Sequence, residues 1–139
     1  MKKLALLVLF ICTLAGCSLS NDDNPNFYLE LNPVESATVP QSFTRGQSYQ
    51  IKMLYKRPST CHYFDGFYFQ PNLETRTIAI QSKVLADNNC QELNEPPVEV
   101  KFDFYVNSPI GTIYKFKFFN GVADNGENTF IIVEVPVTE

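Results

Sequence analysis

The fold class is decided by the stretch Val98-Glu99-Val100-Lys101-Phe102-Asp103-Phe104-Tyr105-Val106, through which apolar residues occupy every second position. Successive side chains of a β-strand point to opposite faces, so a period of two gathers the apolar residues on one side. The face with the three Val and two Phe residues should be buried. The other face carries three charged residues and Tyr105. The stretch therefore predicts a strand with one face in a core and the other in solvent.

The same alternation recurs along the chain. It is found in residues 27–31, 49–55, 114–118 and 131–137. In the first of these runs, Phe27, Leu29 and Leu31 are expected to face the core. Two more strands are expected at 61–69, which is aromatic on both faces, and at 75–85. No stretch after residue 26 repeats apolar residues at helical spacing over three turns.

Turn-forming residues separate these runs, among them Arg45-Gly46, Asp87-Asn88-Asn89 and Ser108-Pro109. About seven strands without a helix predict an all-β domain over residues 27–139. The expected architecture is an antiparallel β-sandwich of immunoglobulin-like type, with a barrel as the alternative. The chain has no Trp, which departs from the antibody pattern.

The first residues read as a secretion signal. Lys2-Lys3 precede an apolar run from Leu4 to Leu14, and the chain turns polar after Cys17. A charged start, a short apolar run and small residues before a cleavage point are typical of a signal peptide. A membrane-spanning helix would need roughly 20 apolar residues, so no transmembrane helix is expected in the mature chain.

The tetrad Leu14-Ala15-Gly16-Cys17 resembles the lipobox of bacterial lipoproteins, which carry a type II signal peptide. The resemblance implies cleavage after residue 16 and acylation of Cys17, so that the mature chain is held on a membrane by its lipid. The alternative is an ordinary signal peptide with an incidental Cys. Residues 17–26 are then a lipidated start and a flexible tether, since they are polar and include Asp22-Asp23.

Removing residues 1–16 also removes Lys2 and Lys3. The mature chain then has nine Lys and Arg against fifteen Asp and Glu, a net charge of −6. Nucleic-acid binding needs clustered basic residues, so no nucleic-acid partner is expected. The balance also offers no polybasic attraction to an anionic membrane, which leaves the lipid as the membrane contact.

Two cysteines remain in the expected domain, Cys61 and Cys90. In an exported protein an even pair favours a disulfide. Closing a loop of about 30 residues would stabilise the fold by roughly 3.6 kcal/mol in the chain-entropy model. A metal site built from this pair and His62 is disfavoured, because two Cys and one His leave a fourth ligand missing.

No catalytic set stands out. The chain has a single His, His62, near Asp65, and no nucleophile motif, so we expect neither an enzyme nor a cofactor. An enzyme would need a cleft that gathers His62 with two carboxylates.

The stretch Asp124-Asn125-Gly126-Glu127-Asn128 offers oxygen ligands for calcium. The same residues suit a hairpin turn, and the turn is the favoured interpretation.

Aromatic residues crowd the run Tyr63-Phe64-Asp65-Gly66-Phe67-Tyr68-Phe69 at both parities. A strand of a sandwich buries one face only, so something must cover the other. The favoured cover is the chain's own connection, tied down through Cys61 and Cys90. If that cover is missing, Phe64 and Tyr68 are the candidate contact surface.

From Phe27 onward the chain also resembles small lipoproteins of Bacteroidetes-type bacteria, on Pro58-Ser59-Thr60-Cys61-His62 and on Ile131 to Val137. These families have no assigned activity. The resemblance implies a location in the bacterial cell envelope, at the outer membrane, with a periplasmic or surface facing. The expected function is a lipid-anchored, non-catalytic binding or interaction domain with an envelope protein or a glycan as partner. The alternative is a structural or accessory subunit of an outer-membrane complex.

Overall fold

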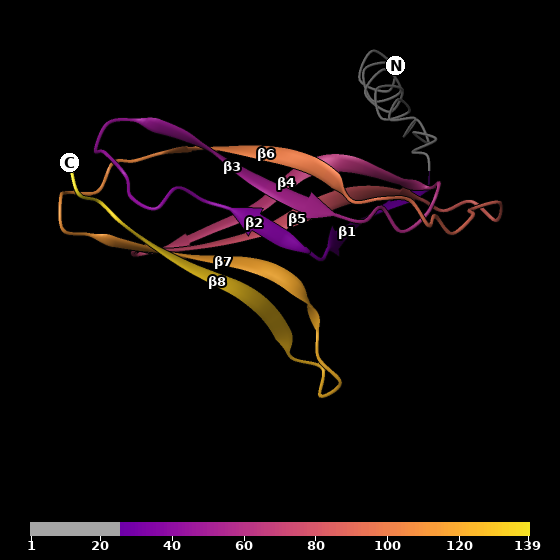
Figure 1. The fold of residues 1–139 in the computed structure, drawn as a ribbon. Helices are drawn as coiled ribbons and strands as arrows, with labels where there is room; N and C mark the ends of the chain where they lie inside the picture. Colours follow the sequence, from indigo (N-terminus) through magenta and orange to yellow (C-terminus); the bar gives the residue numbers. More distant parts are fainter. Residues whose placement is uncertain (1–25) are drawn as a thin grey trace, which may run out of the picture.

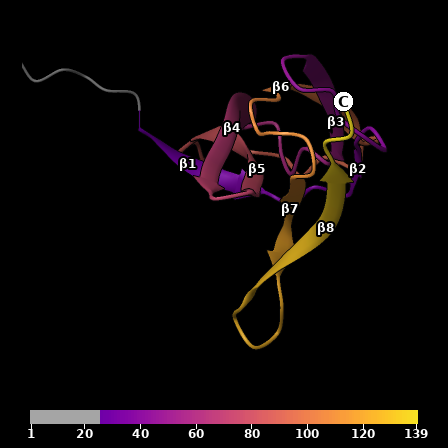
Figure 2. The ribbon, with the colours of Figure 1, turned by 90° about the vertical axis from the view of Figure 1, so that its left-hand side faces the viewer.

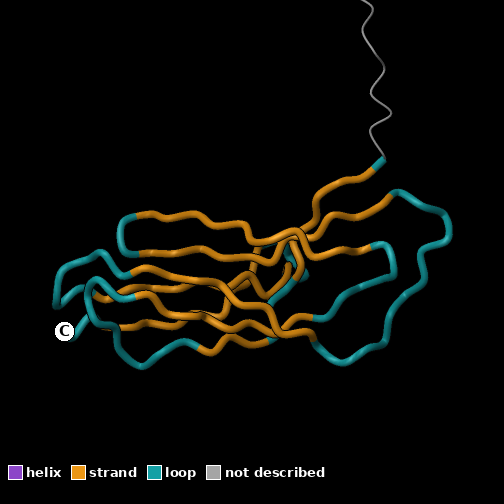
Figure 3. The backbone as a smooth tube through the Cα atoms, turned by 90° about the horizontal axis from the view of Figure 1, so that it is seen from above, coloured by secondary structure: helices purple, strands orange, loops and turns teal. Residues whose placement is uncertain are grey.

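The computed structural model describes residues 26–139. The lipobox, the signal segment 1–16 and nearly all of the expected tether 17–26 lie outside the described residues. The described chain consists of strands joined by turns and loops (Figures 1 and 3). It has eight strands: β1 (Phe27–Asn32), β2 (Ser36–Thr38), β3 (Ser48–Tyr55), β4 (His62–Asn72), β5 (Thr75–Leu85), β6 (Val98–Tyr105), β7 (Ile113–Val122) and β8 (Asn128–Pro136). Residues 26–139 contain no helix that could cross a membrane.

The strands form two sheets, which confirms the all-β prediction. One sheet has three strands in the order β2-β3-β6. The other has five strands: β4 pairs with one edge of β5, and β1 and β7 share the other edge, with β8 beyond β7. Figure 2 shows β4 and β5 on one side of the domain and β3 and β6 on the other.

Two details differ from the expected sandwich. The short strand β2 was not predicted, because three residues are too few to show an alternation. The sheet is also not wholly antiparallel, since β5 and β7 pair in parallel over Thr75–Ile78 and Lys115–Phe118. The reason is topological. After β5 the chain crosses to the opposite sheet to form β6 and then crosses back to form β7. Strand β7 therefore runs in the same direction as β5.

The core lies between the two sheets, and the predicted alternation identifies most of it. Ile51, Met53, Phe104 and Val106 from one side meet Tyr114, Phe116, Phe118 and Val135 from the other, all at most 5% exposed. Phe43, in the connection before β3, joins this cluster with its ring 4.9 to 6.0 Å from four aromatic neighbours. It was not predicted, because a single bridge to Val137 leaves no periodic signal.

Strand β1 is the exception to the alternation. It pairs with β5 so that Leu29 lies opposite Lys83 and Leu31 opposite Gln81, on the outer face of the sheet. Phe27, Leu29 and Leu31 are exposed, while Asn32 on the other parity is buried. The prediction that these three apolar residues face the core was therefore wrong.

Candidate functional site

Strand β4 carries the expected contact residues and changes faces midway. Among the described strands it pairs only with β5, and its register shifts between Phe64 and Phe67. Phe64 lies opposite Ser82 and Phe67 opposite Ile80, so Asp65 and Gly66 together face a single residue of β5. This is a β-bulge, and Gly66 supplies its positive φ of 93°.

The bulge separates Phe64 from Tyr68. Phe64, Phe67 and Phe69 share the inward side of the sheet, whereas Tyr63 and Tyr68 point outward. Phe64 is 46% exposed and Tyr68 is 40% exposed. Both residues are therefore open, but they lie on opposite faces of β4 and belong to two different surfaces.

The prediction that the chain's own connection covers these aromatic side chains is wrong. The connection after β5 pairs instead with the segment before β4: the Thr60 N–H donates to the Gln91 carbonyl at 2.9 Å, and the Leu93 N–H donates to the Pro58 carbonyl at 3.1 Å. The predicted disulfide is confirmed, with an S–S distance of 2.01 Å between Cys61 and Cys90. It fastens this connection at the beginning of β4, away from the middle of the strand.

The first surface lies between the edges of the two sheets, where β4 approaches β6. The Phe102 ring centroid is 5.4 Å from that of Phe67 and 5.3 Å from that of Phe69. Beside them is a groove of about 380 Å³, called here the edge groove. It is lined by Phe69, Pro71, Arg76, Phe102, Asp103, Phe104, Tyr105 and Asn107.

Two kinds of contact hold the Arg76 side chain at this groove. Its Nη1 donates to the carbonyls of Leu73 and Thr75, and its guanidinium carbon lies 5.0 Å from the centre of the Tyr114 ring. A guanidinium fixed over an aromatic ring keeps further N–H donors in a set plane. The groove thus combines aromatic walls with a held cation, and Asp103 and Asn107 lie among its lining residues.

The second surface is the outer face of the five-stranded sheet. Its exposed apolar residues on β1 and β4 are called here the outer patch: Phe27, Leu29, Leu31, Tyr63 and Tyr68, each 38% to 54% exposed. They are neighbours through β5, since Tyr63 and Leu29 both lie opposite Lys83. The Lys83 Nζ sits 3.9 Å from the centre of the Phe27 ring.

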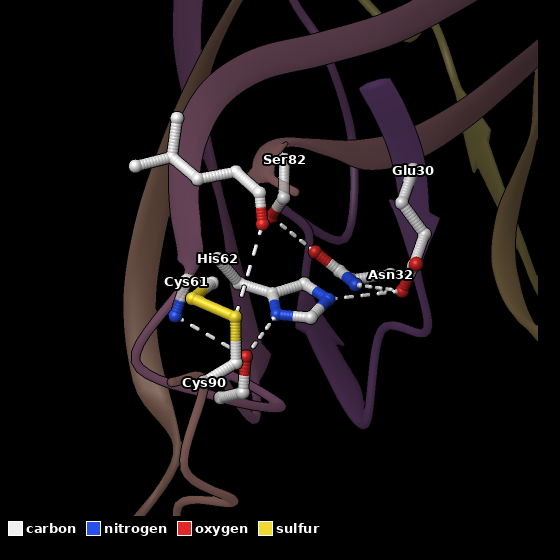
Figure 4. Close-up of polar contacts among 8 residues, drawn as sticks. Glu30, Asn32, Cys61, His62, Ser82 and Cys90 are labelled. Carbon is white, nitrogen blue, oxygen red and sulfur yellow. Dashed lines mark hydrogen bonds and ion pairs between the residues drawn. A yellow bond between two sulfur atoms is a disulfide. The ribbon is translucent and has the colours of Figure 1, made fainter. Parts of the chain in front are cut away.

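A polar network lies on the inward side, beside the disulfide (Figure 4). His62 is 8% exposed; its Nδ1 is 2.7 Å from Ser59 Oγ and its Nε2 is 3.3 Å from Glu30 Oε1. Asn32 Nδ2 donates to the same Glu30 oxygen, and Ser82 Oγ donates to Asn32 Oδ1. The network therefore joins β1, the start of β4 and β5 through side chains.

The side chains of this network bond mainly to one another. His62 meets one carboxylate, Glu30, rather than the two that the enzyme hypothesis asked for, and Asp65 instead accepts from Gln81. The Ser59 oxygen also accepts the N–H of Cys61, which closes the turn before β4. Within residues 26–139 no three His, Cys, Asp or Glu side chains converge on a point where a metal ion could bind.

Residues 124–128 form the tip of the β7–β8 hairpin, as the favoured interpretation expected. The Gly126 N–H donates to the Ala123 carbonyl at 2.8 Å, and the Glu127 N–H donates to Asn125 Oδ1 at 3.0 Å. Asn125 Nδ2 donates to Glu127 Oε2 at 3.0 Å. The side-chain oxygens of Asn125 and Glu127 accept hydrogen bonds inside the turn.

Sequence reasoning missed several residues at these surfaces. Arg76 of β5 and Phe102 of β6 line the same groove because the edges of the two sheets approach each other, which no local pattern encodes. The sequence did contain a signal for the point in β4 where the inward side chains change parity. Asp65-Gly66 inside an aromatic strand is the kind of pair that marks a bulge. Comparison of the chain with protein-family models, curated proteins and solved structures finds no match.

Proposed function

We propose that the protein is a lipid-anchored component of the bacterial cell envelope, at the outer membrane, and that its domain is a non-catalytic binding module that holds its ligand in the edge groove. Residues 1–16 are the signal peptide, Cys17 is the lipidated residue, and residues up to 26 are the tether. The single observation that carries the binding role is the edge groove. The lipobox carries the anchor.

The chemistry of the groove favours a glycan. Ligand sites are mostly apolar clefts with a few placed polar groups. Phe69 and Phe102 stack with their planes 28° apart and form an apolar wall of the groove. Arg76, Asp103 and Asn107 supply donors and acceptors beside it. A sugar ring has an apolar face for the aromatic surface and hydroxyls for the polar rim.

An immunoglobulin-like scaffold is part of the proposal. The order β2-β3-β6 corresponds to the A-B-E order of one immunoglobulin sheet. The parallel pair β5–β7 departs from that pattern. The binding proposal needs only two facing sheets whose edges approach each other.

The test is glycan retention by the full chain in detergent. Phe69→Ala and Asp103→Asn should each weaken retention at least tenfold, about 1.4 kcal/mol or more. Tyr28→Ala is the matched control, because Tyr28 is 52% exposed on β1 and does not line the groove. Equal retention by all three variants would remove the groove from the proposal. The anchor is tested separately by intact mass, which should show a chain that begins at acylated Cys17.

An accessory subunit of an outer-membrane complex is the second candidate. The observation in its favour is the outer patch, since exposed apolar surface often marks a protein interface. A pull-down from detergent-solubilised membranes separates the two. One stable protein partner in stoichiometric amount favours the accessory role, and glycan retention favours the binding module.

A further inference from the structure

The outer patch is unusual because the apolar residues of β1 lie on it and not in the core. In β1 the three inward positions are taken by Tyr28, Glu30 and Asn32, and Phe27, Leu29 and Leu31 point away from the core. Burying Leu29 and Leu31 instead would have required only a shift of register by one residue. The outward placement leaves an exposed apolar face, which is a candidate contact surface.

The position of the patch relative to the expected anchor points to the occupant. Phe27, the first residue of β1, is also a member of the patch. Only the nine residues 18–26 separate it from Cys17, and nine extended residues span at most about 30 Å. A lipid on Cys17 would hold the patch within that distance of the bilayer. Such tethering makes even a weak second contact effective, because the second contact is intramolecular.

The charges of the patch suit an anionic bilayer. Residues 26–139 hold nine Lys and Arg against thirteen Asp and Glu, a net charge of −4. At the patch, Lys83 lies over Phe27 and Arg57 lies 5.6 Å from the centre of the Tyr63 ring, against one acid, Asp65. Lysines among aromatic and Leu side chains are typical of surfaces that lie in the lipid headgroup region.

A second copy of the chain fits the patch less well. A two-fold dimer would set the patch against itself. The contact would then bring together two copies of Lys83 and two of Arg57, and like charges repel. The geometry points to the lipid bilayer: we infer that the outer patch docks on the membrane that carries the anchor, an inference that rests on the proposed lipidation of Cys17.

The test uses the full lipidated chain in vesicles of phosphatidylethanolamine and anionic phosphatidylglycerol. A fluorescent label is placed at Gln81→Cys, opposite Leu31 in the patch, or at Lys101→Cys, on the outer face of the other sheet. Lipids with brominated chains should quench and blue-shift the label at position 81 and leave position 101 unchanged. Adding Leu29→Glu should abolish the quenching at position 81 while the protein still floats with the vesicles.

The outcomes separate the docking from the anchor. Flotation with acyl mass on Cys17 but equal, water-like emission at both positions would overturn the docking and leave the anchor standing. A chain without acyl mass that does not float would overturn both. A label at position 81 that is shielded from iodide but not quenched by brominated lipid would also overturn the docking, in favour of a protein partner or a second copy.

Discussion

The outer faces of the two sheets differ in kind. The three-stranded sheet turns Gln50, Lys52, Glu99 and Lys101 to solvent, all exposed. The five-stranded sheet turns out Phe27, Leu29, Leu31, Tyr63 and Tyr68, which are exposed as well. Both sheets bury their inner faces in one core. The difference teaches that the rule of apolar residues inward and polar residues outward fails on β1 and β4, whereas β7 still buries Tyr114, Phe116 and Phe118 and turns Lys115 outward.

The reason lies in two local features of the five-stranded sheet. In β1 the parity is set by side chains that bond inward, with Asn32 joined to Ser82 and Glu30 joined to His62. In β4 the bulge at Asp65-Gly66 reverses the parity halfway. Hydrogen bonds and one extra residue therefore override the apolar pattern in this sheet.

The largest expected effect on the free energy of unfolding comes from replacing an inner side chain, compared with replacing an outer one. Phe116 is fully buried with its ring 5.1 Å from Phe104 and 6.0 Å from Phe118. Phe116→Ala should lower the free energy of unfolding by about 3–5 kcal/mol, because it leaves a cavity between the sheets. Leu29→Ala, at an exposed site, should change it by no more than about 0.5 kcal/mol. Urea unfolding measures both, and equal losses would mean that the outer patch is a buried surface in solution.

The disulfide should stabilise the two sheets unequally. Replacing both Cys61 and Cys90 by Ser opens the loop between two positions 29 apart in the sequence, and the loss should be about 3.6 kcal/mol. Amide hydrogen exchange should speed up first in β4 and later in β3. The reduced wild-type protein is the control and should match the double variant. Free thiols at both positions in the exported protein would contradict the bond.

The sequence predicted the fold class and most of the core residues of both sheets, but not the faces of β1 and β4. Strands β3 and β6 were predicted correctly because both follow the period of two, with the apolar side chains more buried than their polar neighbours. The face of β1 could not be predicted, since Asn32 meets Ser82 across 50 positions of sequence. The edge groove escaped for the same reason: Phe69 and Phe102 meet through tertiary packing. Phe64 and Tyr68 were predicted to form one contact surface only if the connection did not cover them, whereas both are exposed and lie on opposite faces of β4.

The inward hydrogen bonds of β1 can be tested by a double-mutant cycle. Asn32→Val leaves the buried Ser82 hydroxyl without its acceptor and should cost about 1–3 kcal/mol. Adding Ser82→Ala removes the orphaned donor, so the pair should cost less than the sum of the single variants. Unfolding of the three variants in urea gives the coupling. Strict additivity would mean that this bond does not hold the parity of β1.

The bulge in β4 should cost less to disturb. Gly66 has a φ of 93° and no other atom within 4 Å of the place where a Cβ would stand. Gly66→Ala should therefore lose about 1 kcal/mol from the backbone alone. Gly111→Ala is the matched control, with a φ of 90° and the same open space in a loop. Both should lose similar stability, but only Gly66→Ala should alter amide exchange in β4; an unchanged β4 would show that the bulge forms without glycine.

The smallest effect belongs to an inner residue of the three-stranded sheet. Burial raises the pKa of Tyr55 above its usual value of 10.0, and the charge of Arg57 opposes part of that rise. The folded state therefore keeps the phenol proton at a pH where the unfolded chain releases it. Stability from this group is complete below pH ~10 and is lost as the pH rises through the folded pKa. Unfolding in urea between neutral and strongly alkaline pH should show the wild type losing stability relative to Tyr55→Phe only in the alkaline range. A constant difference between the two proteins across that range would mean that Tyr55 titrates as it does in the unfolded chain, and the inner face at this edge would then be as open to water as the outer patch.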